Sequence, residues 1–166
     1  MPTLAITYSP ARPEQLPLLH EIRLAAFAPV FASFRSILGD ELYQLAQARD
    51  DAGQADLLDS LLQPGSKWEI YVVERAAEVV GFVSLQLNHE TKSGEIGLNA
   101  VHPKHAGHGI GTAMYEFALN RMKQAGMLVA TVSTGGDPSH EPARQAYRKA
   151  GFDAEIPSVW MCRRLA

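Results

Sequence analysis

The chain has 166 residues, of which 46% are hydrophobic and 20% charged, and its formal net charge is −3. This length fits one domain, and the composition excludes a disordered or collagen-like chain. The small acidic excess lacks the positive charge that binds a phosphate backbone, so we do not expect nucleic acid as a partner. The single cysteine, Cys162, excludes an intrachain disulfide and fits a reducing compartment.

The N-terminus shows no basic start followed by an apolar run, and no run approaches about 18 consecutive apolar residues. We therefore expect a soluble, cytoplasmic protein with no membrane partner. The charge is unevenly spread: residues 1–83 carry six basic and eleven acidic side chains, and residues 84–166 carry nine and seven. An anionic ligand is expected on the C-terminal half, although solvated helix faces alone produce such an imbalance.

The N-terminal third predicts one strand followed by helices. Residues Leu4–Tyr8 favour a strand, and residues Pro13–Ala28 have apolar side chains at helical spacing, with a stop or kink expected at Pro29. Helical spacing resumes over residues 40–49 and 57–62.

From Glu69 onward the pattern becomes that of a sheet. Residues 70–73 and 79–87 predict a hairpin, and residues 95–101 predict a third antiparallel strand. A helix over 109–124 and an apolar strand over 128–133 then predict a crossover unit, whose strand runs parallel to the third one.

The last part of the chain predicts a short helix over residues 142–150, capped by Gly151, and a closing strand at Val159–Arg163. Together the elements predict an α/β fold of the α+β kind, in which a mixed, mostly antiparallel sheet is flanked by helices in a single domain.

A glycine-rich turn precedes the 109–124 helix, with Gly107, Gly109 and Gly111 at alternate positions. Glycines between a strand and a helix N-terminus let backbone amides approach a phosphate or pyrophosphate. A turn that only accommodates tight packing has the same sequence. A dinucleotide fold is excluded because no acidic residue lies in the following strand, and a P-loop because the Gly-Lys-Ser/Thr ending is missing.

Two motifs carry a family resemblance. The first comprises Val101, Pro103, Gly107, Gly109 and Gly111, and the second Ala143, Tyr147, Gly151 and Phe152. In order and spacing they resemble the two signatures of the GNAT family of N-acetyltransferases, which bind acyl-coenzyme A. The resemblance covers about residues 69–165. Ala106 stands where the family usually has Arg or Gln, and His140 where it usually has Asn.

The resemblance implies one N-acetyltransferase domain over residues 1–166, with acceptor-side helices in 1–68, an acyl-CoA-binding core in 69–166, and a splayed pair of parallel strands. It implies acetyl-CoA as co-substrate and direct attack by an amine in a ternary complex. The implied coenzyme-binding residues are Asn99, Ala100, Val101, Ala106, Gly107, His108, Gly109, Ile110, Gly111, Thr112, His140 and Tyr147.

The resemblance also implies the catalytic groups. Tyr147 occupies the position of a general acid that protonates the departing thiolate, and Glu95 resembles the strand-borne glutamate that serves as base in some members. His89 and Glu90 are alternative bases, and a solvent-facing role for Glu95 also stays open. Simple strand alternation places four residues on one face: Glu95, Gly97, Asn99 and Val101.

Several identities stay open. His102, His105 and His108 recur every third residue, but no carboxylate or thiol is interleaved, so we expect no metal. The acceptor is a small-molecule or peptide amine, and a homodimer is one option for the oligomeric state. Acidic residues on the N-terminal helices suit a cationic acceptor or are solvated helix faces: Asp40, Glu41, Asp50, Asp51, Asp56 and Asp59. The rival function is a catalytically silent acyl-CoA sensor.

Overall fold

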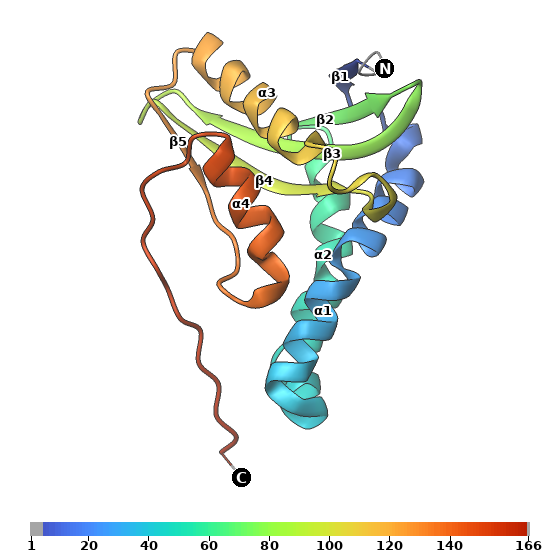
Figure 1. The fold of residues 1–166 in the computed structure, drawn as a ribbon, viewed down its shortest axis with the longest axis vertical. Coiled ribbons are helices and arrows are strands. Elements are labelled where there is room, and N and C mark those ends of the chain that lie inside the picture. The colour runs from blue at the N-terminus through green and yellow to red at the C-terminus, as the bar shows by residue number, and fades with distance from the viewer. Residues whose placement is uncertain (1–4, 166) are drawn as a thin grey trace.

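The computed structural model describes residues 5–165 and contains one five-stranded sheet with helices on both faces (Figure 1). The strands lie in the order β1 (Ile6–Pro10), β2 (Trp68–Arg75), β3 (Glu78–Asn88), β4 (Ser93–Val101) and β5 (Val129–Val132). Neighbours are antiparallel except β4 and β5, which are parallel. The predicted meander and crossover are confirmed. The first strand was predicted from Leu4, which lies outside the described residues.

The helices are α1 (Leu16–Ala46), α2 (Ala48–Leu61), α3 (Ile110–Gln124) and α4 (Glu141–Lys149), with short 3-10 turns η1 (Pro13–Gln15), η2 (Pro103–His105) and η3 (Pro138–His140). Each face of the sheet packs against its own apolar core. On one face, here called the α3 face, buried residues of α3 such as Met114 and Ala118 pack on β2–β4. On the other, the α1 face, Leu19, Ile22 and Leu58 pack on the same strands.

Helix α1 continues beyond the predicted stop. Pro29 lies inside it, and the chain leaves helical geometry only at Gly39, where φ is 75°. The predicted stop was wrong because buried Val30 and the packing of α1 on the sheet outweigh the one backbone hydrogen bond that proline removes. The distal part of α1 and the N-terminal part of α2 project together below the sheet, and the C-terminal end of α2 packs on it (Figure 1).

The segment Pro13–Ala46 is long and apolar enough to span a membrane by length and composition. Core helices of soluble proteins pass the same criterion, which makes it weak support for a membrane. In this fold the segment packs Leu19 and Ile22 against the sheet.

A β-bulge interrupts β4. Val83 of β3 pairs with Asn99 and Leu85 pairs with Ile96, so Ser84 alone faces both Gly97 and Leu98. The Ser84 hydroxyl donates a 2.8 Å hydrogen bond to the Leu98 carbonyl. Such an extra residue shifts the alternation of side chains between the two faces.

The shift overturns the predicted common face of Glu95 and Asn99. A Cβ added to Gly94 would collide with Met122 of α3, which places Gly94 on the α3 face and its neighbour Glu95 on the α1 face. Asn99, beyond the bulge, meets residues of α3 and α4. Glu95 and Asn99 therefore lie on opposite faces of the sheet.

The predicted closing strand at Val159–Arg163 is wrong. Residues 152–165 have no regular secondary structure, and the chain runs away from the sheet after α4 (Figure 1). The β-favouring side chains of this segment do not make a strand on their own, because a strand is completed by hydrogen bonds to a neighbour.

Candidate active site

The parallel strands β4 and β5 separate halfway along β4. Their pairing ends at Ile96 and Val132, and residues 97–101 of β4 have no partner from β5. Alternate peptide groups of this stretch point toward the open edge. Ala100 is buried and Val101 packs into the α3-face core, so here both offer backbone atoms and not reactive side chains. The gap suits an extended ligand that carries amide groups.

The N-terminus of α3 forms an open cradle of amides. Gly107 and Gly109 have φ of 78° and 74°, and the first helical hydrogen bond runs from the Ala113 amide to the Gly109 carbonyl at 3.0 Å. A helix start leaves its first four N–H groups without helical partners, and here no side chain caps them. A Cβ at Gly107 or Gly109 would meet nothing within 4 Å, so backbone conformation alone demands glycine.

The other predicted residues of this loop also line the cradle. Ala106 is extended and exposed, Ile110 is buried in the core and offers only its amide, and the Nδ1 atom of His108 lies 3.2 Å from the His105 carbonyl. Thr112 lies in the first turn of α3. The structure thus brings residues 106–112 together at one helix end, where partial positive charge attracts anions.

Tyr147 of α4 meets Asn99 of β4 beside the open edge. The Asn99 Nδ2 atom donates to the Tyr147 hydroxyl at 3.1 Å and to the Gly97 carbonyl at 2.9 Å. The Tyr115 hydroxyl of α3 donates to Asn99 Oδ1 at 2.9 Å, and the two tyrosine rings stack with centroids 4.2 Å apart. Sequence reasoning missed Tyr115.

The proton of Tyr147 is firmly held at neutral pH. The side chain is 6% exposed, and burial raises the pKa of its hydroxyl above the ordinary value of 10, against the opposing effect of the polar neighbours Tyr115 and Asn99. Because the hydroxyl oxygen accepts a hydrogen bond from Asn99, its own O–H is left to donate elsewhere. This is the state that a general acid requires.

His140 is tied to a polar clasp that sequence reasoning missed. Asp137 accepts hydrogen bonds from the Ser139 and Ser33 hydroxyls, the latter at 2.7 Å, and its other oxygen contacts His140 Nδ1. The His140 ring stacks on Phe34 of α1. Because Ser33 and Asp137 are 104 residues apart, only the fold reveals that the loop before α4 is fastened to α1.

Burial tends to raise the pKa of Asp137, but hydrogen bonds from Ser139, Ser33 and His140 together hold that pKa well below its usual range. The carboxylate therefore stays ionised. The clasp fixes the entry of α4, seven residues before Tyr147.

The candidate bases lie along β4 and its hairpin turn. Glu95 is exposed on the α1 face, four residues from Asn99, which is roughly 13 Å along an extended strand. His89 and Glu90 lie farther away in the β3–β4 turn, where the Glu90 amide donates to Asn88 Oδ1 at 3.1 Å. Glu95 is thus the nearest of the three to Asn99, at a distance that requires bridging water.

The three spaced histidines serve different contacts. His102 accepts a hydrogen bond from the Lys104 amide, and His105 Nε2 lies 3.5 Å from Glu78. Within residues 5–165, no three His, Cys, Asp or Glu side chains gather as a metal site would need.

Four of the six acids predicted on the N-terminal helices have a side-chain partner. Asp40 accepts from Arg35 at 2.5 Å, Asp51 from Tyr43 at 2.7 Å, and Asp59 lies 2.7 Å from His20. Glu41 pairs with Arg164. Asp50 and Asp56 are exposed. The contacts favour solvated and self-paired helix faces over a shared cation site.

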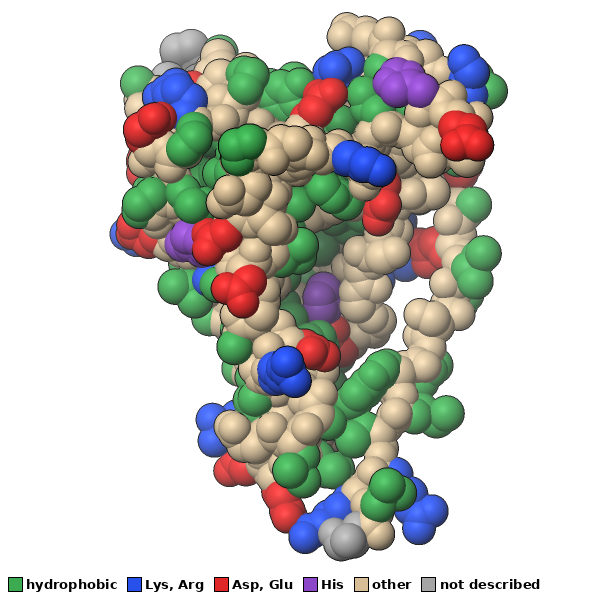
Figure 2. Space-filling model, turned by 180° about the vertical axis from the view of Figure 1, so that it is seen from behind, with side chains coloured by type: hydrophobic (Ala, Val, Ile, Leu, Met, Phe, Trp, Pro, Cys, Tyr) green, Lys and Arg blue, Asp and Glu red, His purple; other side chains and the backbone are tan. Residues whose placement is uncertain are grey.

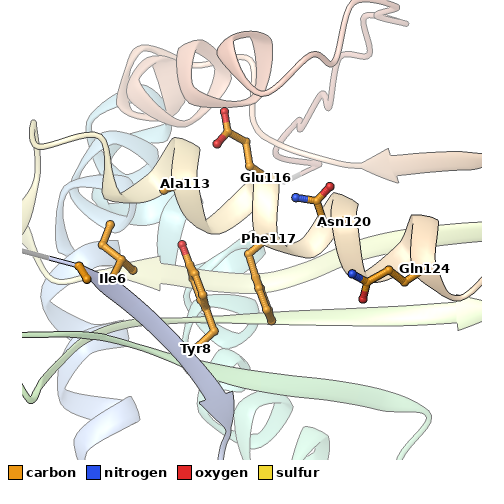
Figure 3. Close-up of a pocket in the computed structure, with 8 residues that line it drawn as sticks. Ile6, Tyr8, Ala113, Glu116, Phe117, Asn120 and Gln124 are labelled. Atoms are coloured by element: carbon orange, nitrogen blue, oxygen red, sulfur yellow. The ribbon is translucent and has the colours of Figure 1, made fainter.

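A separate groove lies between β1 and the outer side of α3 (Figure 3). Tyr8 stacks on Phe117 there with centroids 4.1 Å apart, and burial together with Glu116 raises the pKa of Tyr8 to about 12. Apart from Ala113, none of the residues that line the groove belongs to the site described above.

Comparisons with known proteins agree with this geometry. The model of the acetyltransferase (GNAT) family matches residues 31–152. Among curated proteins, no relative matches.

Solved structures show the same fold at low sequence identity. The PaiA N-acetyltransferase of Thermoplasma acidophilum in complex with coenzyme A is 18% identical, with a TM-score of 0.70 over 93% of this chain and 94% of that one. A ribosomal-protein alanine N-acetyltransferase of Escherichia coli is 15% identical, with a TM-score of 0.61 over 92% and 80%. An aminoglycoside acetyltransferase from an uncultured soil metagenomic sample is 19% identical, with a TM-score of 0.60 over 97% and 100%.

Proposed function

Because this chain belongs to the acetyltransferase (GNAT) family, we propose that it transfers an acetyl group from acetyl-CoA to an amine acceptor. One observation carries the proposal: a buried, protonated Tyr147 hydroxyl bonded to Asn99 beside the open edge of β4. The coenzyme A complex of a protein with the same fold supports the choice of co-substrate.

The residues present fit the coenzyme. Residues 106–112 would hold the pyrophosphate through main-chain amides, so the absence of Arg or Gln at Ala106 removes a side chain but leaves the cradle. The backbone of residues 99–101 would hold the pantetheine arm at the open edge, and Tyr147 would lie near the sulfur. His140 would contribute less, because Asp137 and Phe34 engage its ring.

Acetyl-CoA supplies a thioester carbonyl and a thiolate leaving group. Within the chain, main-chain amides at the β4 bulge polarise the carbonyl oxygen, and Tyr147 donates its proton to the departing sulfur. Asn99 fixes the Tyr147 oxygen, and Tyr115 fixes Asn99 in turn, so the acid is held in place before reaction.

The amine must lose a proton before it attacks. Glu95 is the base that we propose, acting through water from the α1 face, where the acceptor-side helices lie. Cys162 lies in the segment after α4, outside both motifs, and takes no part as a nucleophile.

The acceptor that we propose is a small amine. Support comes from an aminoglycoside acetyltransferase of the same fold, whereas another protein of this fold acts on an alanine. The self-paired acids of α1 and α2 do not select strongly for multiply charged acceptors.

Thiol release from acetyl-CoA over a panel of amines tests the proposal. The panel contains a polyamine, an aminoglycoside and an alanine-initiated peptide, and acetyl-CoA thermal shift is measured in parallel. Release with one acceptor class establishes the transferase. A thermal shift without release for any amine would indicate the silent sensor, and the lack of any shift would remove coenzyme binding.

A further inference from the structure

Ser84, in the middle of β3, is completely buried. Among residues 5–165, the two other polar or charged side chains that are buried, Arg23 and Asp51, keep exposed fractions of 4% and 8%. A buried hydroxyl lowers the stability of a fold unless it has a hydrogen-bond partner, and alanine fills almost the same space. The hydroxyl of Ser84 therefore calls for an explanation that packing does not give.

The partner of this hydroxyl is the backbone of the β4 bulge. Ser84 donates to the Leu98 carbonyl at 2.8 Å, and it faces both Gly97 and Leu98 across the ladder. A Cβ added to Gly97 would collide with the Trp68 ring and would lie 2.8 Å from the Ser84 hydroxyl oxygen. Glycine at position 97 thus allows the hydroxyl and the indole ring to pack directly against the bulge.

No part of Ser84 reaches the molecular surface. Seen from the side opposite to Figure 1, helices α1 and α2 form a column below the sheet, and a hollow with hydrophobic side chains on its walls lies beside that column (Figure 2). The Ser84 hydroxyl has no part in this surface. Whatever it does for a ligand must therefore pass through the strand to which it bonds.

The ladder between β3 and β4 sets the direction of the peptide groups beyond the bulge. The His102 amide donates to the Val80 carbonyl at 2.8 Å, which makes these two residues a hydrogen-bonded pair. Bonded and non-bonded pairs alternate along an antiparallel ladder, so Val83 and Asn99, three positions on, form a non-bonded pair. The N–H of Asn99 therefore points away from β3, toward the edge that β5 leaves open.

Ser84 holds the same peptide group from its other end. The Leu98 carbonyl and the Asn99 N–H belong to one peptide unit, and the described part of the chain has no cis peptide bond. In a planar trans unit the two groups point in opposite directions. A hydroxyl that holds the Leu98 carbonyl toward β3 thus turns the Asn99 N–H toward the open edge, at the point where the bulge disrupts the ladder.

We propose that Ser84 is a positioning residue, which aims the Asn99 N–H at the thioester carbonyl of acetyl-CoA. This role rests on the proposed function, because it assigns the polarising amide at the bulge to one residue and gives it a support. Asn99 then serves twice: its side chain bonds to the Tyr147 hydroxyl at 3.1 Å, and its backbone faces the carbonyl. A donor whose direction is fixed beforehand stabilises negative charge on the carbonyl oxygen without reorganisation as the amine attacks.

The infrared frequency of the bound thioester carbonyl tests the role directly. Acetyl-CoA labelled with a heavy isotope at this carbonyl is bound without an acceptor, and the Asn99 N–H should lower the stretching frequency below that of free acetyl-CoA. In Ser84→Ala the frequency should move back toward the free value. The Kd for acetyl-CoA, measured by calorimetry, should stay within about twofold of the wild type, because the amides at the start of α3 supply the binding of the pyrophosphate.

Turnover should follow the carbonyl frequency. Loss of an oxyanion donor lowers kcat roughly 100- to 1000-fold, and Ser84→Ala only loosens the donor, so its kcat should fall about tenfold. Ser84→Cys keeps a weaker S–H donor and should lie between Ser84→Ala and the wild type. Thr131→Val is the matched control, since it removes a strand hydroxyl that donates to another β4 carbonyl, that of Gly94, at 3.3 Å. Its carbonyl frequency and kcat should equal those of the wild type.

The outcomes separate this role from the proposed function. Equal carbonyl frequencies in the wild type and Ser84→Ala would overturn the role of Ser84 and leave acetyl transfer itself standing. A parallel loss of kcat and coenzyme affinity would also overturn it, because Ser84 would then only stabilise the fold. A wild type that binds no acetyl-CoA would instead remove the proposed function, and this role with it.

Discussion

On the α3 face of the sheet, polar groups from three separate elements converge on one point, whereas three of the acids on α1 and α2 pair within these two helices. Asn99, Tyr115 and Tyr147 come from β4, α3 and α4. Asp51, by contrast, bonds to Tyr43 and Gln47, only a few residues away. Convergence of distant elements holds these three side chains in a fixed arrangement, whereas pairing within α1 and α2 leaves the surface of these helices freer to vary.

The largest effect should come from removal of the acid on the α3 face. Tyr147→Phe should lower kcat about 100-fold, at the low end for general acids because a thiolate is a good leaving group. The Kd for acetyl-CoA should change little, since the ring stays. Steady-state kinetics and calorimetry measure the two quantities.

Tyr71→Phe is the matched control for this change. It deletes a tyrosine hydroxyl that also bonds to another side chain, Glu69 at 2.8 Å, but outside the site. Its kcat should match that of the wild type. Equal losses of kcat and coenzyme affinity in Tyr147→Phe would refute the general-acid role.

The next effect should come from the clasp that joins the two faces. Asp137→Asn should lower the free energy of unfolding by about 2 kcal/mol, because a charged acceptor of several hydrogen bonds is lost. Ser33→Ala removes only the bond to α1 and should cost about 1 kcal/mol. Urea denaturation measures both changes. Equal free energies of unfolding for the wild type and the two variants would show that the clasp does not stabilise the fold.

The clasp also has a pH signature. The pKa of Asp137 is lower in the folded chain than in the unfolded one, where it is about 4. The contribution of this carboxylate to the free energy of unfolding is therefore full above pH 4 and is lost as the pH falls through the lower pKa of the folded chain. The stability difference between wild type and Asp137→Asn should therefore be full at pH 7 and shrink below pH 4.

A smaller effect should follow from strain in the amide cradle. Gly109→Ala places a side chain on a residue with φ of 74°, which costs roughly 1–2 kcal/mol. If the loop relieves this strain by leaving its conformation, the Kd for acetyl-CoA should rise about tenfold. Gly53→Ala, in α2 with open space around it, should leave the Kd unchanged. An unaltered Kd in Gly109→Ala would mean that the cradle does not bind the pyrophosphate.

The smallest effect is expected from the base on the α1 face. Glu95→Gln should lower kcat/KM several-fold near neutral pH and move the acidic limb of its pH profile, because a water-mediated base is partly replaceable. Asp56→Asn is the control for loss of one exposed carboxylate on that face. A profile that stays in place after Glu95→Gln would exclude Glu95 as the base.

The sequence predicted the parts that depend on local signals. Gly107 and Gly109 take positive φ, and their spacing at alternate positions predicted a turn of accessible backbone amides. The helix from residue 110 to 124 and the parallel β5 followed from periodicity and chain order. Family membership followed from two motifs in register.

Long-range contacts explain what the sequence did not reveal. The Ser33–Asp137 bond joins residues that no periodicity connects, and the β4 bulge arises from pairing with Ser84 on another strand. The closing strand failed for the same reason: residues 159–163 have strand-forming side chains, but hydrogen bonding to a neighbour decides whether they form one.

The bulge in β4 has a consequence for proton transfer in the proposed reaction. By turning Glu95 and Asn99 to opposite sides, one surplus residue would separate, in the proposed reaction, the base that takes a proton from the amine and the acid that gives one to the sulfur. The sheet would then lie between the Glu95 and Tyr147 side chains, so the two groups could not exchange a proton by direct contact. Removal of a single residue at 97 or 98 would return Glu95 and Asn99 to the same face of the sheet. The length of this short segment is therefore as consequential as any side chain in it.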